Sequence, residues 1–144
     1  MIVLSLVSFV AFPIIGVLLD KWGRVPVLIL SLIFAGVGFS LIATLSDPFS
    51  KVTLLYMALC GIGLSGAVVG ANTLAVDGSP PGMIGTILGG LNTMQPFGIL
   101  IFLQLGGLLF DKVGPGSAFL LKGLADLAVG IWIFFVKGKI KSEV

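Results

Sequence analysis

The hydrophobic residues of this chain are grouped into long runs, each about as long as a membrane span, and the polar residues are grouped between them. Apolar runs of about 20 residues are separated by short segments that hold most of the charges, prolines and turn glycines. A helix needs about 20 apolar residues to cross roughly 30 Å of hydrocarbon. The pattern therefore predicts five antiparallel transmembrane helices, with spans at about 1–19, 26–45, 53–75, 84–109 and 117–136.

The type of spanning element follows from the periodicity within each run. The runs are continuously apolar and lack the two-residue alternation of a barrel strand, and the segments between them are short and carry Pro or Gly. A helix also satisfies its own backbone hydrogen bonds in lipid. We therefore predict an all-α polytopic membrane protein that ends in a short basic tail at 137–144.

The composition supports a lipid bilayer as the surrounding solvent. Of the 144 residues, 58% are apolar and 10% are charged, with a mean hydropathy of +1.24, whereas a soluble domain has about 25% charged residues. The formal charge of +2 and the lack of a basic run interleaved with aromatics argue against nucleic acid. With no His and one cysteine, Cys60, the chain offers no internal disulfide and no His/Cys metal site. No cofactor and no enzyme active site are predicted.

The distribution of Lys and Arg sets the expected orientation, because cytoplasmic segments carry the excess of these residues. We expect the N-terminus outside and the C-terminus in the cytoplasm, in the plasma (inner) membrane. The cytoplasmic side then holds Lys21, Arg24, Lys137, Lys139 and Lys141, and the opposite side holds Lys51, Lys112 and Lys122.

Two charged turns share one pattern. GVLLDKWGRVP at 16–26 follows the first span and GLLFDKVG at 107–114 follows the fourth, and their Asp, Lys and Gly align at an offset of 91 residues. Three spans lie between the turns, so we expect them on opposite faces of the membrane, as in an inverted-topology repeat of three helices. The alternative is that the pattern is a common turn after any membrane helix.

The first turn resembles the loop signature of the major facilitator superfamily. That signature runs Gly, any residue, Leu, small, Asp, basic, any residue, Gly, Arg, basic. The chain departs from it at Leu19, where a small residue is usual, and at Val25, where a second basic residue is usual. Residues 80–121 also resemble the family's eleventh helix and its turn into the twelfth, although Ile84 stands where an Arg usually precedes the glycine.

The resemblance covers nearly the whole chain. It implies that the five spans are the eighth to twelfth helices of a twelve-helix transporter and form part of one six-helix half. It also implies that the N-terminal half and the seventh helix are missing partners, so that the chain is a C-terminal portion of a larger transporter. The alternative is a genuine short protein.

The first turn supplies a candidate conformational latch, made of Gly16, Asp20, Gly23 and Arg24. Asp20 and Arg24 are four residues apart and can pair if a helical turn persists between them. The two glycines let the backbone approach a neighbouring helix closely. The resemblance implies the same role, since the matching family residues hold one state of the alternating-access cycle. The alternative is a turn that only fixes topology.

Polar side chains within the fourth span are candidates for substrate binding. Asn92 and Gln95 are three residues apart near its middle and share a helix face. Pro96 follows and can interrupt the backbone hydrogen bonds, which exposes carbonyls. Such a helix suits a wall that faces a small-molecule substrate, and the resemblance agrees because the family's eleventh helix lines its cavity. Hydrogen bonding between helices is the alternative.

Asp126 is a candidate coupling carboxylate in the fifth span. It lies near the centre of that span, four residues after Lys122, and a lone central Asp costs about 2.5–3.5 kcal/mol. One reading is a carboxylate that couples transport to a proton or cation. The other is an Asp126 that pairs with Lys122 or faces another helix while the Lys122 side chain extends towards the interface.

We predict transport of a small solute by a major-facilitator-type secondary transporter through alternating access. A membrane enzyme is not predicted, because no nucleophile, base or metal cluster assembles. The remaining alternative is a non-transporting helical membrane scaffold or assembly partner. The residues do not specify a substrate, because amides bind many classes of solute.

Overall fold

The structure is a computed structural model that describes residues 2–45 and 51–140. These residues form five α-helices and no strand: α1 (Ile2–Trp22), α2 (Arg24–Ala43), α3 (Lys51–Asp77), α4 (Ile84–Lys112) and α5 (Ser117–Ile140). This confirms the predicted all-α class. Residues 137–140, expected at the start of the tail, continue helix α5, and residues 141–144 lie outside the described part of the chain.

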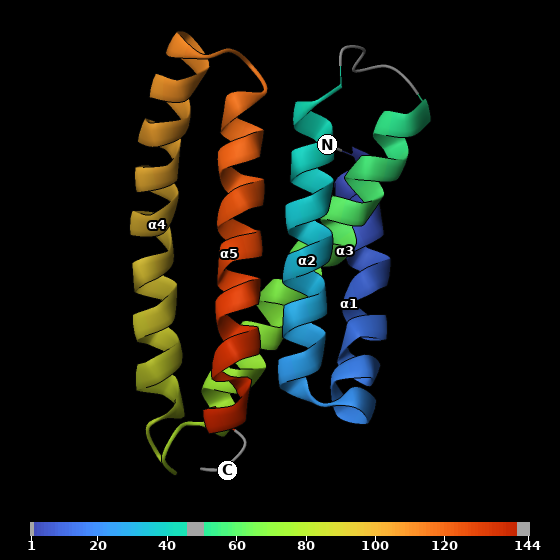
Figure 1. Ribbon diagram of the computed structural model, residues 1–144. Coiled ribbons are helices and arrows are strands. Elements are labelled where there is room, and N and C mark those ends of the chain that lie inside the picture. The colour runs from blue at the N-terminus through green and yellow to red at the C-terminus, as the bar shows by residue number, and fades with distance from the viewer. Residues whose placement is uncertain (1, 46–50, 141–144) are drawn as a thin grey trace.

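Four helical segments among the described residues are long and apolar enough to cross a bilayer: Arg24–Ala43, Lys51–Asp77, Ile84–Lys112 and Ser117–Val136. Helix α1 is formed, but its role as a membrane span stays a prediction. Figure 1 shows helices that run alternately in opposite directions, with the α1–α2 and α3–α4 connections at one end and the α4–α5 turn at the other. The two turns that share the Asp-Lys-x-Gly pattern therefore lie at opposite ends of the bundle.

Both turns reverse the chain at a glycine with a positive φ angle. Gly23 has φ 87° and is the single residue between α1 and α2, and Gly114 has φ 130° in the turn between α4 and α5. L side chains rarely adopt such angles, so glycine is the residue that fits both positions. The two glycines are also equivalent under the 91-residue offset, so both turns place a glycine with a positive φ angle at the same position of the shared pattern.

Helix α2 lies at the centre of the bundle and packs closely on two sides. On one side the glycines of α3 face small residues of α2, and a Cβ atom at Gly63 would overlap the backbone of Ala35. On the other side α5 lies against α2, and a Cβ atom at Gly36 would be 2.6 Å from Leu127 Cγ. Without water to drive helices together, such backbone approach supplies the packing energy of the bundle.

The other helices are attached at the margins. The apolar core cluster consists of Ala11, Ile15 and Leu19 of α1 with Val27 of α2, and Leu18 and Val69 pack against it. Helix α4 contacts α5 and α3, and Gly106 is its one buried residue. In Figure 1, α4 stands at the edge of the bundle beside α5.

The α2–α3 crossing should be sensitive to a single methyl group. We expect Gly63→Ala to destabilise the bundle by about 1–3 kcal/mol, because the added carbon must displace the Ala35 backbone. Gly98→Ala is the matched control, since a Cβ atom there meets nothing within 4 Å. The measurement is the thermal unfolding midpoint in detergent, and equal midpoints for the two variants would contradict the close crossing.

The two turns should be reached from different compartments. Trp22 and Val113 are 65% and 72% exposed, so each can be replaced by cysteine in a Cys60→Ala background. In a host that inserts the chain into its plasma membrane, a membrane-impermeant maleimide added to intact cells should label Val113→Cys, whereas Trp22→Cys should react only after the cells are permeabilised. The reverse pattern would overturn the expected orientation, and labelling of both from one side would overturn the arrangement itself.

Candidate functional site

The candidate site is built around Arg24, the first residue of α2. Its guanidinium forms an ion pair with the carboxylate of Asp77, at the end of α3. The same Nη1 donates a hydrogen bond of 3.4 Å to the backbone carbonyl oxygen of Thr73, one turn earlier. A cation suits this position, because the last carbonyls of a helix lack intrahelical donors and carry partial negative charge. Arg24 thereby joins the start of α2 to the end of α3.

This contact is weak enough to break. Both side chains are partly exposed, and ion pairs of this kind contribute about 0–1 kcal/mol. An interaction of that size does little for the stability of a bundle that packs by close helix contact. It is large enough to favour one of two similar arrangements of α2 and α3 by up to about fivefold.

The pairing of Asp20 with Arg24 that their spacing allows is not the one observed. It requires a helical turn from residue 20 to residue 24, and the φ angle of 87° at Gly23 interrupts that turn. Asp20 is exposed on the last turn of α1. Gly16 also makes no close helix contact, since a Cβ atom there would meet nothing within 4 Å. The part that Gly16, Asp20 and Gly23 play in a latch stays a prediction.

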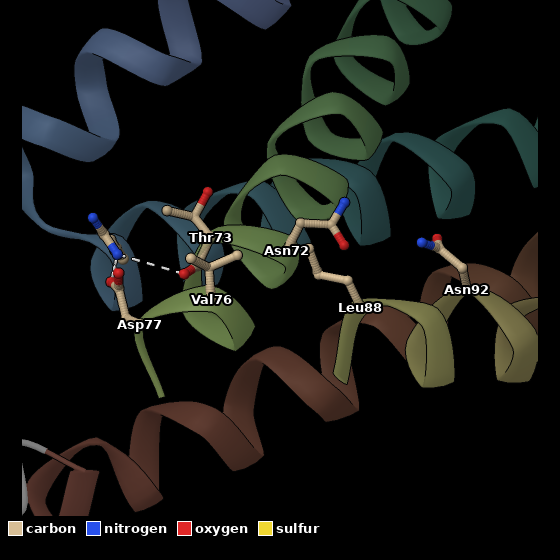
Figure 2. A pocket seen from close by; sticks show the side chains of 7 residues that line it. Asn72, Thr73, Val76, Asp77, Leu88 and Asn92 are labelled. Carbon is tan, nitrogen blue, oxygen red and sulfur yellow. Dashed lines mark hydrogen bonds and ion pairs between the residues drawn. The ribbon is translucent and has the colours of Figure 1, made fainter. Parts of the chain in front are cut away.

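A cavity of about 330 Å³ opens beside the ion pair. It is open to the outside and is lined by residues of α2, α3 and α4, namely Arg24, Asn72, Thr73, Val76, Asp77, Leu88 and Asn92. Figure 2 shows Asp77 and Thr73 on one side of this group and Asn92 on the other, with Asn72 and Leu88 between them. The cavity thus brings a predicted latch residue, Arg24, together with a predicted substrate-binding residue, Asn92.

Pro96 leaves the backbone carbonyl of Asn92 without its usual hydrogen-bond donor. Helix α4 continues through Pro96. Proline has no N–H, however, so the backbone carbonyl of Asn92 loses the donor that position 96 normally supplies. Asn92 can therefore offer both its side-chain amide and its carbonyl oxygen to the cavity, which makes this turn of α4 able to donate and to accept hydrogen bonds.

The two candidate binding residues of α4, Asn92 and Gln95, lie closer to one end of the helix than the sequence suggests. Helix α4 has 29 residues and extends to Lys112, so Asn92 lies about 9 Å short of its midpoint at about 1.5 Å per residue. Gln95 is exposed one turn further along and does not line the cavity. Its role in substrate binding stays a prediction.

Three residues of the site were not singled out for it by the sequence patterns: Asp77, Thr73 and Asn72. A signal for Asp77 was available, because an acid at the end of the third span must lie on the same face as the first turn. Asn72 lies near the end of the third span, a place that equally suits a helix contact or cap, and it lines the cavity.

Asp126 lies outside this cavity, in a cluster between α5 and α2. Its Oδ1 pairs with Lys122, whose Nζ lies 5.4 Å from the centre of the Phe39 ring. The Asp126 side chain is 13% exposed, and its Oδ2 atom is buried without a hydrogen-bond partner among the described residues. The pairing follows one of the two expected arrangements, and a coupling role for Asp126 stays a prediction. Within the described ranges, no group of three or more metal-ligating side chains lies together.

These features define a polytopic helical membrane protein in which polar side chains of three helices meet at one end of the bundle. The chain belongs to the Major Facilitator Superfamily, which it matches over residues 1–143. The resemblance of the charged turns to that family is thereby confirmed. The family is one of membrane transporters.

Several curated proteins are similar over most of this chain. It is 28% identical over 126 residues to the magnetosome protein MamH of Paramagnetospirillum magneticum, an alignment that covers 88% of this chain and 29% of MamH. It is 28% identical over 129 residues to the magnetosome protein MamZ of Magnetospirillum gryphiswaldense, covering 90% of this chain and 20% of MamZ. The chain therefore spans less than a third of the length of these relatives. No solved structure gave a significant match.

Loss of Lys122 alone should lower the stability of the bundle more than replacement of both members of the Lys122–Asp126 ion pair. We expect Lys122→Met to destabilise the bundle by about 1–3 kcal/mol, because it leaves the largely buried Asp126 carboxylate without its partly exposed counter-ion. The double variant Lys122→Met/Asp126→Leu should recover most of that loss. Chemical unfolding in detergent measures both, and equal losses in the single and double variants would show that the carboxylate is not held as a buried charge.

Proposed function

We propose that this chain forms part of a secondary transporter that moves a small polar solute across the membrane by alternating access. The single observation that carries the proposal is the cavity between α2, α3 and α4, in which the Arg24–Asp77 ion pair borders the amides of Asn72 and Asn92. One small space thus holds a breakable contact between two helices and groups that can bind a solute.

The ion pair serves as the latch in this proposal. It joins the start of α2 to the end of α3 on the expected cytoplasmic side, so the two helix ends cannot separate while it is formed. Its small free energy favours the closed arrangement without trapping it. A solute that binds better when the helix ends are apart would shift the population toward the open state by its difference in affinity.

The cavity favours a polar solute without a large net charge. Arg24 and Asp77 neutralise each other, and the amides of Asn72 and Asn92 each offer donors and an acceptor. Gln95 is placed in the same pathway, one turn further into the membrane. Asp126 is the candidate for coupling to a proton or cation, since it is the one acid in the interior of a described helix away from its ends.

The remaining helices of a twelve-helix transporter are the proposed partners of this chain. Helix α4 supports this, because nearly all of its surface is exposed, including the large apolar residues Leu91, Met94, Phe97 and Ile101. Lipid can cover such a surface, but the cavity that Asn92 lines would then stay open on the side away from α2 and α3. The N-terminal half that the family resemblance implies would supply the opposite wall.

The names of the relatives support a specific membrane as the location. MamH and MamZ are magnetosome proteins, and we propose the magnetosome membrane as the location of this chain in a cell that forms magnetosomes. The plasma (inner) membrane is the location expected from sequence alone. Fractionation of cells that carry a tagged chain separates the two proposals.

Transport with site variants tests the function. The protein encoded by the complete gene is reconstituted in proteoliposomes, and counterflow of a panel of radiolabelled polar solutes is measured. We expect Asn92→Ala and Gln95→Ala to raise the apparent KM by about fivefold, since each removes a hydrogen bond of about 1 kcal/mol. Asp20→Asn and Asp77→Asn should change turnover with KM nearly constant.

The matched control is Gln104→Ala, an exposed amide of the same helix that lies more than three turns beyond Asn92 and outside the proposed pathway. It should leave KM and turnover unchanged. Unaltered transport in all four site variants would remove the site assignments. A protein that moves no solute of the panel, yet remains folded, would favour the helical scaffold over the transporter.

A further inference from the structure

Pro13 and Pro96 lie in the interior of helices, the first in α1 and the second in α4. Each lacks the backbone N–H that would bond to the carbonyl four residues earlier, so the carbonyls of Phe9 and Asn92 lose their usual donor. Hydrocarbon cannot supply a replacement, and a backbone group without a partner is costly in lipid. Of these two carbonyls, the one of Asn92 belongs to a residue that lines the cavity.

The freed carbonyl lies on the side of α4 that carries the Asn92 side chain and Pro96. Residues four apart share a helix face, and a helical side chain covers the turn before its own Cα atom. The Pro96 ring therefore lies over the turn of the Asn92 carbonyl, where an amide hydrogen would otherwise be. The neighbouring hydroxyl of Thr93 does not replace that hydrogen, because it donates to the Gly89 carbonyl oxygen at 2.8 Å.

Asn92 thus combines three hydrogen-bonding atoms at one place. Its side-chain Oδ1 and its backbone carbonyl oxygen accept, and its side-chain Nδ2 donates. A bound group that has two N–H donors and one acceptor can satisfy all three atoms at once. A hydroxyl offers a single donor and a carboxylate offers none, so each leaves at least one acceptor of Asn92 without a partner.

The charges around the cavity favour a neutral group at Asn92. Asp77 is the one acid among the described lining residues, and it is paired with Arg24. That pair lies at the end of α3 and the start of α2, whereas Asn92 lies about 12 Å beyond the start of α4 at Ile84. Figure 2 accordingly shows Asp77 and Asn92 on opposite sides of the group. A cation bound at Asn92 would lose hydration without gaining a counter-ion.

The remaining lining residues add apolar surface beside the amides. Val76 lies one turn from Asn72 on α3, and Leu88 lies one turn from Asn92 on α4. Both side chains contain only carbon and hydrogen, so they cannot bond to a polar group of a solute. They suit a solute whose hydrogen-bonding group is attached to a small apolar body.

We propose that Asn92 and Pro96 select neutral solutes with a terminal –CO–NH2 group, as in a primary amide or a urea. The N–H beside the solute carbonyl donates to Asn92 Oδ1, and the solute carbonyl accepts from Asn92 Nδ2. The second N–H donates to the backbone carbonyl oxygen of Asn92. Pro96 is a positioning residue that acts by keeping this oxygen free. The inference rests on the proposed function, because it names the class of solute for the same cavity.

Equilibrium binding of benzamide and N,N-dimethylbenzamide tests this proposal. The protein encoded by the complete gene is placed in lipid nanodiscs, and binding to empty nanodiscs is subtracted. The two ligands share a ring and a carbonyl, but the dimethyl compound has no N–H. In Pro96→Ala the returned N–H occupies the Asn92 carbonyl, so benzamide should bind about fivefold more weakly while the dimethyl compound is unaffected. A general shift of α4 would affect both ligands, so the ratio of their dissociation constants is measured.

Pro13→Ala is the matched control, because it makes the same change inside a helix that does not line the cavity. It should leave the ratio unchanged. Asn92→Ala separates the side chain from the backbone. It should weaken both ligands, since each loses its bond to Nδ2, and benzamide should keep a preference that Pro96→Ala then removes.

Three results would overturn the proposal. An unchanged ratio in Pro96→Ala would show that the Asn92 carbonyl does not contact the solute. Tighter binding of benzylammonium than of benzamide would make this a cation site. Absence of saturable binding of either amide to the folded protein would remove the amide class.

Counterflow by the same protein separates this proposal from the proposed function. If another solute of the panel is moved, any of these three results removes the amide class and leaves transport in place. If the expected ratio is found but no solute is moved, the ligand class is upheld and transport is removed.

Discussion

The close approach of α2 to α3 on one side and to α5 on the other is the contact on which the rest of the structure depends. Helices in lipid gain little from burying apolar surface, because the hydrocarbon around them is equally apolar. What holds them together is van der Waals contact, and this grows as backbones come closer. At Gly63 with Ala35 and at Gly36 with Gly123 the backbones are so close that no methyl group fits between them without a shift. Helix α2 thereby fixes where both neighbours cross it.

The candidate site is a consequence of these crossings. Because Gly63, Gly66 and Gly70 of α3 lie along α2, the end of α3 arrives at the start of α2, which places Asp77 and the Thr73 carbonyl beside Arg24. Helix α4 follows after a short turn and contributes Asn92 from the third side of the cavity. The rigid part of the bundle thus presents a weak contact and hydrogen-bonding groups at its edge, where small helix movements have large effects.

The sequence predicted the helices better than it predicted which side chains contact each other. Long apolar runs and charged turns are local properties, so the five helices and the opposite placement of the two turns could be predicted from them. The partner of Arg24 could not, because spacing along one helix favours Asp20, and only the backbone angle at Gly23 removes that choice. Asp77 is distant in sequence, and it reaches Arg24 through the crossing of α2 and α3. The sequence also could not show that Gly16 makes no close helix contact, because that depends on how the helices pack. Nor could it show that Asn92 lies toward one end of α4, because that depends on where the helix ends.

The two turns that share the Asp-Lys-x-Gly pattern differ in charge, and this difference bears on the proposed mechanism. Both turns contain a glycine with a positive φ angle, yet the position equivalent to Arg24 is Pro115, which has no charge and no N–H. The interhelical ion pair therefore exists in only one of the two equivalent turns. The second half of the repeat carries its charges within α5 instead, where Lys122 and Asp126 take the places of Ser31 and Ala35. The partly exposed Arg24–Asp77 pair lies at one end of the bundle, and the Lys122–Asp126 pair, of which the carboxylate is largely buried, lies toward the other. A bundle with this distribution can separate its helices at the Arg24 end while the opposite end stays packed, which is the asymmetry that access from one side at a time requires.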